Sequence, residues 1–140
     1  MATIFTKIID GELPGRFVWR DEKAVAFLTI NPLNPGHTLV VPRREVDHWL
    51  DLEPAQLAHL TSVSHTISRA IQEAFRPTKV GLIIAGLEVP HVHIHLIPID
   101  KLEDLSFARA DKNPDPEKMD EAAERIRATL RRMGAPGVSE

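Results

Sequence analysis

Residues 91–96 read His-Val-His-Ile-His-Leu, a strict alternation of histidine with apolar side chains. Because successive side chains of a β-strand point to opposite faces of a sheet, this period of two predicts a strand. Its apolar face would be buried, whereas the three imidazoles, each about 7 Å from the next, would share the other face. The chain is therefore expected to contain a sheet with one buried face and one face that carries chemistry.

Glycine, proline and the apolar periodicity divide the rest of the chain into short strands and two helices. A period of three to four residues, with Pro54 in the first turn, predicts a long amphipathic helix over 54–75. Asp115 as N-cap, Pro116 and Gly134 delimit a second helix. Further strands are expected at 16–19, 24–28, 38–41, 79–85 and 91–97. Short connectors between neighbouring strands predict an antiparallel sheet with helices packed on one side, an α+β fold.

The length of 140 residues suits one compact domain with a single core. We expect a core over about residues 1–100, a loop at 101–113 and a C-terminal helix at 114–134. Apolar residues make up 43% and charged residues 26% of the chain, which is typical of a soluble globular protein.

Charge and composition exclude several kinds of partner and site. The net charge is −3 and no block of basic residues stands out, which argues against nucleic-acid binding. Because the chain has no cysteine, a disulfide framework, a thiolate zinc site and a cysteine nucleophile are excluded. No apolar run approaches the roughly 20 residues that span a bilayer, and the first residues do not resemble a secretory signal. A cytoplasmic protein without a membrane partner is expected.

The alternating histidines have three explanations that differ in chemistry. Core packing alone explains them poorly, because histidine is typically exposed or singly satisfied in a core. Neutral imidazole is a common metal ligand, but a zinc hydrolase would need further ligands and an open position for water. A neutral imidazole can also attack phosphorus and form a covalent intermediate, while its neighbours orient it and stabilise charge. The spacing by itself leaves the metal and the nucleophilic explanations open.

Three segments, in order along the chain, resemble the signatures of one known family. His91-Val-His-Ile-His-Leu-Ile97 matches a His-x-His-x-His motif followed by apolar residues. Residues 4–14 (IFTKIIDGELP) and residues 26–42 (AFLTINPLNPGHTLVVP) match two upstream segments. Together they resemble the histidine-triad (HIT) family, over about two-thirds of the chain.

This resemblance implies an α+β sheet domain, a homodimer, and a nucleotide pocket beside the histidine strand. It also implies cleavage or transfer at the α-phosphorus of a nucleoside phosphate derivative through a nucleotidyl-histidine intermediate, as in nucleotide phosphoramidases and dinucleoside polyphosphate hydrolases. By position in the motif, His93 would be the nucleophile. His95 would bind a phosphate oxygen and help the leaving group depart, and His91 and His37 would complete the site and fix tautomers. That chemistry needs no metal and no cofactor.

The resemblance also places the nucleotide-binding side chains, and two of them depart from the family pattern. The expected positions are Phe5, Ile8, Phe27, Leu28, Thr29, Ile30, Glu88 and Val89. Thr29 replaces an aspartate that holds ribose hydroxyls in many members, and a hydroxyl cannot supply a charge-assisted bidentate acceptor. Glu88 stands where a small polar residue often meets the phosphate, so its carboxylate would repel a polyanionic ligand, recognise an amine or simply face solvent.

Zinc-binding relatives carry Cys-x-x-Cys near the start and a histidine after the Val-Pro-basic-basic stretch. This chain has Thr3, Thr6 and Glu45 at those positions, so a structural zinc site of that kind is not expected. The remaining histidines, His48, His59 and His65, are expected to face water near or on the long helix.

Nucleotide hydrolysis or transfer is therefore the leading prediction for function. A non-catalytic nucleotide or metabolite binding module is the alternative that the departures at Thr29 and Glu88 support. A metal-dependent hydrolase ranks third, because no nearby carboxylate or cysteine has an evident ligand spacing.

Overall fold

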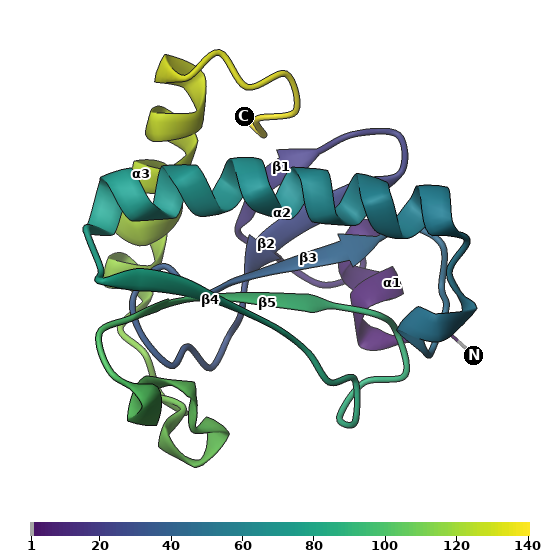
Figure 1. Ribbon diagram of the computed structural model, residues 1–140, viewed down its shortest axis with the longest axis horizontal. Helices are drawn as coiled ribbons and strands as arrows, with labels where there is room; N and C mark the ends of the chain where they lie inside the picture. The colour runs from purple at the N-terminus through teal and green to yellow at the C-terminus, as the bar shows by residue number, and fades with distance from the viewer. Residues whose placement is uncertain (1) are drawn as a thin grey trace.

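The computed structural model describes residues 2–140 and consists of one sheet, three α-helices and short 3-10 helices (Figure 1). The elements in chain order are α1 (Ile4–Ile9), β1 (Phe17–Arg20), β2 (Ala24–Leu28), β3 (Thr38–Pro42), η1 (Trp49–Asp51), α2 (Pro54–Phe75), β4 (Lys79–Ile84), β5 (Ile94–Ile99), η2 (Leu102–Leu105), η3 (Phe107–Arg109) and α3 (Pro116–Arg132). Within residues 2–140, no helix combines the length and the apolar character needed to cross a membrane.

The five strands lie in the order β1-β2-β3-β5-β4, and every neighbouring pair is antiparallel. β5 is an inner strand, with Leu39 of β3 and Ile83 of β4 opposite His95 on its two sides. The predicted antiparallel sheet and α+β class are confirmed. A histidine on an inner strand has backbone neighbours on both sides, which fixes where its side chain points.

The two faces of the sheet have different covers (Figure 1). α2 and α3 pack on one face, where alternate residues of β2 and β5 join their buried side chains in the main core, among them Ala26, Leu28, Ile94 and Leu96. α1 packs on the opposite face, where Phe5 and Ile8 meet Phe27, Leu39 and Val41. The prediction of helices on one side is right for α2 and α3 and incomplete, because it missed α1.

The strand that carries the histidines begins at Ile94, later than the predicted residue 91. Upstream of it, His91 donates its backbone N–H to Val89 O, and Val92 donates to Val46 O. Because these backbone groups bond to Val89 and Val46, pairing with β3 begins only at Ile94. His91 and His93 therefore lie on an irregular segment that leads into β5.

The helix predictions hold closely at the boundaries. α2 spans 54–75 as predicted, and α3 begins after Asp115, whose carboxylate accepts the N–H of Glu117. α3 ends at Arg132, and Met133, which follows it, is exposed. The predicted loop at 101–113 contains the 3-10 helices η2 and η3.

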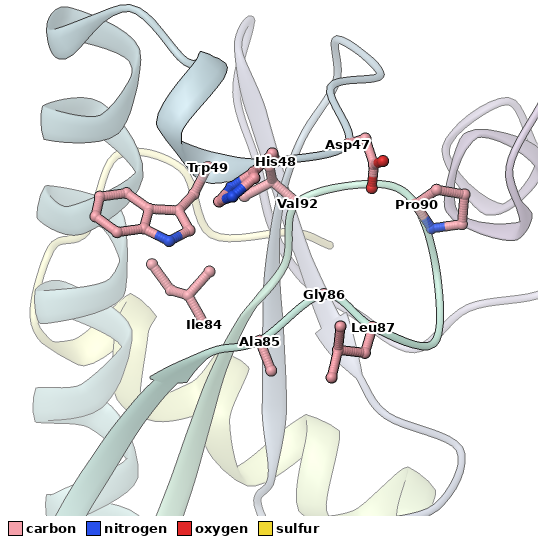
Figure 2. Close-up of a pocket in the computed structure, with 9 residues that line it drawn as sticks. All are labelled: Asp47, His48, Trp49, Ile84, Ala85, Gly86, Leu87, Pro90 and Val92. Carbon is pink, nitrogen blue, oxygen red and sulfur yellow. The ribbon is translucent and has the colours of Figure 1, made fainter.

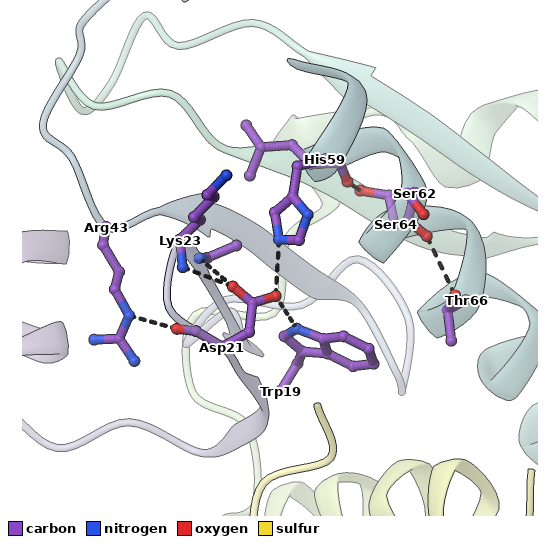
Figure 3. A network of polar contacts seen from close by, with 10 residues as sticks. Trp19, Asp21, Lys23, Arg43, His59, Ser62, Ser64 and Thr66 are labelled. Atoms are coloured by element: carbon purple, nitrogen blue, oxygen red, sulfur yellow. Dashed lines mark hydrogen bonds and ion pairs between the residues drawn. The ribbon is translucent and has the colours of Figure 1, made fainter. Parts of the chain in front are cut away.

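A polar network around Asp21 fastens the β1–β2 turn to α2 (Figure 3). The Asp21 carboxylate accepts the indole N–H of Trp19 and the backbone N–H groups of Lys23 and Ala24. It also lies 2.8 Å from Nε2 of His59 on α2. His59, predicted to face water near or on the long helix, lies on α2 with its side chain 36% exposed and this carboxylate as its partner. His48 and His65 are exposed.

Candidate active site

His37 is held by the loop between β2 and β3, which folds back on its own ring. The backbone N–H of Leu33 donates to Nδ1 of His37 at 3.0 Å. Gly36 makes this turn with a φ of +99°, and a Cβ there would approach the ring of Phe75 on α2 to 2.8 Å. Only glycine satisfies both conditions. Since Nδ1 accepts a hydrogen bond, the proton of the neutral His37 ring lies on Nε2.

The proton on His37 sets the tautomer of His95. Nε2 of His37 lies 2.9 Å from Nδ1 of His95. Because the His37 nitrogen donates, Nδ1 of His95 accepts, and the proton of the neutral His95 ring is on Nε2. His95 therefore presents an N–H donor to a ligand on this face of the sheet.

His93 has the opposite arrangement. Its Nδ1 lies 2.8 Å from the backbone carbonyl oxygen of His91, an acceptor only, so Nδ1 carries the proton. Nε2 of His93 then has a free lone pair. The His93 and His95 rings lie 4.9 Å apart between centroids. A nucleophilic nitrogen and an N–H donor thus stand side by side.

Burial keeps these rings neutral, as that arrangement requires. Desolvation lowers the pKa of His37 to about 3, helped by the neighbouring His95 and His93. Burial, with a contribution from His93, lowers the pKa of His95 to about 4. The pKa values of His91 and His93 are also lowered, and burial is the largest cause for both. Near pH 7 all four imidazoles are in the neutral form that can accept and donate at different nitrogens.

Two phenylalanines flank the pair of imidazoles. Phe5 of α1 meets the His93 ring edge-to-face at 4.9 Å, and Phe107 of η3 meets the His95 ring in the same way at 4.9 Å. Phe5 is buried, but Phe107 remains 39% exposed and can contact a ligand. No pattern in the sequence pointed to Phe107, because it stands in a stretch without periodicity. The signal that could have found it is a lone aromatic residue in that polar segment.

The predicted nucleotide-binding residues fall into three groups. Phe5, Ile8 and Phe27 are buried in the cluster on the histidine face, and Val89 packs against that cluster. Thr29, the 65% exposed Ile30 and the exposed Glu88 lie on loops. The structure contradicts the prediction for Leu28.

Leu28 lies in the main core between the sheet and the helices. Its side chain therefore points away from the histidines, because β2 residues alternate between faces and Phe27 occupies the histidine side. Leu28 cannot line a pocket beside His93.

His91 takes part in a different environment from the other two strand histidines. Its ring is fully buried, with Nε2 2.8 Å from Pro42 O and Nδ1 2.7 Å from the hydroxyl of Thr3. Pro42 O can only accept, so Nε2 donates and the Thr3 hydroxyl donates to Nδ1. Both ring nitrogens are thus occupied by protein groups. Neither is free to bind a metal ion, and within residues 2–140 no three acidic, histidine or cysteine side chains group as metal ligands.

A cavity of about 370 Å³ lies elsewhere, between the segment that leads into η1 and the β4–β5 loop (Figure 2). Trp49, His48 and Ile84 line it together with Val92, whose side chain belongs to the main core. None of the four clustered histidines lines this cavity. The candidate active site is therefore the histidine cluster rather than this cavity.

The fold and the site together place this protein in a class that combines an antiparallel sheet with a buried histidine cluster, which lies on β5 and on the segment before it. The family model for the HIT domain matches residues 10–102. The chain belongs to the histidine-triad family.

Three curated relatives show the range of the family. An uncharacterised HIT-like protein of Methanocaldococcus jannaschii is 39% identical over 99 residues, which cover 68% of this chain and 77% of the relative. The asymmetrical bis(5'-nucleosyl)-tetraphosphatase of Schizosaccharomyces pombe is 34% identical, over 68% of this chain and 57% of the enzyme. An adenylylsulfatase of Arabidopsis thaliana is 31% identical, over 92% of this chain and 68% of the enzyme.

A solved structure shares nearly the whole fold. A zinc-bound histidine-triad family protein from Mycobacterium smegmatis superposes with a TM-score of 0.83. It is 28% identical, over 96% of this chain and 97% of that protein.

Proposed function

We propose that this protein is a nucleotide hydrolase or nucleotidyl transferase that acts at the α-phosphorus of a nucleoside phosphate derivative. The observation that carries the proposal is the pair of complementary tautomers, the free Nε2 lone pair of His93 beside the Nε2–H of His95. Relatives named as a tetraphosphatase and an adenylylsulfatase support the substrate class, since both act on nucleotides.

In the first step, Nε2 of His93 attacks the α-phosphorus, and a P–N bond forms as the bond from phosphorus to the leaving group breaks. The leaving group departs with the electron pair of that bond, while the Nε2–H of His95 donates a hydrogen bond to it or to a phosphate oxygen. The His93 ring becomes positively charged. Its Nδ1–H points at the carbonyl of His91, which stabilises that charge.

In the second step, a water molecule attacks the nucleotidyl group. Its oxygen bonds to phosphorus, one of its protons passes to the solvent, and the electron pair of the P–N bond returns to Nε2 of His93, which becomes neutral again. The product is a nucleoside monophosphate. If an alcohol or amine attacked in place of water, the same bonds would form and break at phosphorus, and the nucleotidyl group would be transferred to that acceptor.

The test is turnover of a panel of adenosine and guanosine phosphoramidates, dinucleoside polyphosphates and adenylyl sulfate, each with and without chelator. We expect turnover that survives chelation. His93→Ala should lower kcat by roughly 10³-fold or more, because it removes the nucleophile itself. His65→Ala, the same change at an exposed position on α2, is the control and should leave kcat unchanged.

The same panel distinguishes the alternatives. Mass spectrometry after an alkaline quench should detect a nucleotidyl adduct on His93, because a phosphorus–nitrogen bond survives at high pH. Tight nucleotide binding without turnover would instead favour a binding module, which the exposed carboxylate of Glu88 supports. Turnover that chelator abolishes would favour a metal-dependent hydrolase.

A further inference from the structure

The first turn of α1 is fastened to the segment after β3 by one carboxylate. Oε1 of Glu45 accepts the backbone N–H of Thr3 and the hydroxyl of Thr6, both at 2.8 Å. The Thr3 hydroxyl in turn accepts the backbone N–H of Thr6 and caps the helix. These bonds join residues about 40 positions apart in the sequence.

The network continues from α1 to the first strand histidine. The Thr3 hydroxyl donates to Nδ1 of His91 at 2.7 Å, and Nε2 of His91 donates to Pro42 O at 2.8 Å. The fully buried His91 ring is therefore held from both sides. A ring held at both nitrogens cannot rotate without leaving a buried polar atom unpaired, which costs about 1–3 kcal/mol.

The carbonyl of the same residue, His91, is the acceptor for Nδ1–H of His93. This carbonyl lies on the irregular segment before β5, in the same peptide unit as the backbone N–H of Val92, which donates to Val46 O at 2.7 Å. The position of the His91 ring is a second constraint on the group that orients the nucleophile.

The residues here do not fit the zinc site of zinc-binding relatives. Hydroxyls of Thr3 and Thr6 stand in place of thiolates, and both nitrogens of His91 are already hydrogen-bonded. Zinc in proteins is bound by thiolate, imidazole and carboxylate, and neutral hydroxyls are not among these ligands, so His91 and Glu45 alone cannot complete a four-coordinate structural site. Where those relatives bind zinc, the hydrogen bonds of Thr3, Thr6 and Glu45 join α1 to the segment after β3.

We infer that Thr3 and Glu45 are positioning residues, which hold the His91 carbonyl against Nδ1 of His93 through a metal-free network of hydrogen bonds. The inference rests on the proposed function for its kinetic consequence only. Its structural consequence, the tautomer of His93, can be measured without any substrate.

The test compares Thr3→Val, which removes the hydroxyl at nearly constant volume, with Thr3→Ser, which keeps it. Nitrogen-15 NMR of the imidazole rings reports which nitrogen of His93 carries the proton. We expect the Nδ1–H form in the wild type and in Thr3→Ser, and a mixture of both tautomers in Thr3→Val. With a substrate that the wild type turns over, kcat should fall about 10- to 100-fold in Thr3→Val with KM changed less than threefold, because a misplaced nucleophile costs rate rather than binding.

Glu45→Ala should weaken the same arrangement, whereas Glu45→Gln retains an oxygen acceptor and should behave as the wild type. Thr61→Val, at an exposed hydroxyl that bonds only its own helix, is the matched control. The purified protein should contain less than one zinc ion per ten chains, and chelator should leave the His93 tautomer unchanged.

A Thr3→Val protein that stays folded and keeps the Nδ1–H form of His93 would overturn the inference, as would a bound zinc ion whose removal changes that tautomer. If Thr3→Val does not fold, Glu45→Ala against Glu45→Gln gives the same comparison at the exposed end of the network. Absence of turnover in the wild type would contradict the proposed function and leave the tautomer measurement valid.

Discussion

At the residue scale, each histidine of the cluster has a tautomer that one neighbouring group decides. Leu33 N–H decides it for His37, His37 for His95, the His91 carbonyl for His93 and the Pro42 carbonyl for His91. The partners are three main-chain groups and one side chain, each from a different part of the chain. The chemical difference between His93 and His95, which have identical side chains, therefore comes entirely from what each Nδ1 meets.

Glu88 gives a prediction about which ligands this face accepts. Its exposed carboxylate is close enough to raise the pKa of His93, although burial has the larger and opposite effect. Glu88→Gln should lower KM for a dinucleoside polyphosphate by about two- to fivefold, because a surface repulsion of that kind is worth a fraction of a kcal/mol. KM for a phosphoramidate with a cationic leaving group should not fall.

Steady-state kinetics at low and high salt check this, since salt should reduce the difference. Glu22→Gln, an exposed carboxylate in the β1–β2 turn, is the control. An equal change for both substrates would contradict the prediction.

At the element scale, the two edges of the sheet differ. The outer edge of β1 is covered by the C-terminal segment, where Arg20 N–H bonds to Gly137 O and Ser139 N–H bonds to Val18 O. Within residues 2–140, no backbone hydrogen bond covers the outer edge of β4, and Leu82 on that strand is 51% exposed. An open strand edge is a ready template for pairing with another chain.

The family resemblance predicts a homodimer, and β4 is where we expect a second copy to pair, by antiparallel alignment about a twofold axis. Leu82→Glu should shift the protein toward the monomer, because it places two charges at the pairing line. Sedimentation velocity over a range of concentrations measures this. Leu102→Glu, the same change at an 81% exposed residue of η2, should leave the distribution unchanged. A wild type that is monomeric at every concentration would show the prediction to be wrong.

At the scale of the whole molecule, the buried histidines make stability depend on pH. The pKa values of all four are lowered in the folded state, with His37 near 3 and His95 near 4 against an ordinary value of 6.5. Between these values the unfolded chain binds protons that the folded chain does not. Their contribution to stability is therefore complete above pH 6.5 and is lost as the pH falls toward 4 and then 3.

The free energy of unfolding should fall by roughly 1.4 kcal/mol per pH unit for each histidine that titrates only in the unfolded state. Urea denaturation in steps from pH 7.5 to pH 5 measures the slope. Asp21 and Glu45 also have lowered pKa values, but they change the free energy of unfolding only below their ordinary values of 3.8 and 4.5, which lie outside this pH range. His37→Gln should reduce the slope and the exposed-site control His65→Gln should not; equal slopes would refute the assignment.

Much of this molecule could be predicted from the sequence because the signals are local. A period of two places the histidines of residues 91–95 on one face, a period of 3.6 defines α2, and the Asp115-Pro116 pair starts α3. Local rules did not predict α1, whose six residues are too few for a periodic signal. They also extended β5 too far, because backbone bonds to Val46 and within the turn redirect the chain.

By itself, then, the alternation in residues 91–96 determined that histidines would gather on one side of a sheet, since alternation is a property of any extended chain. Only the tertiary structure decided what each ring does. It brought Leu33, His37 and Thr3 to particular nitrogens, moved Leu28 to the opposite face and set Phe107 beside His95. Such contacts join residues far apart in the chain, and their geometry depends on how helices and loops pack around the sheet rather than on any spacing within the sequence.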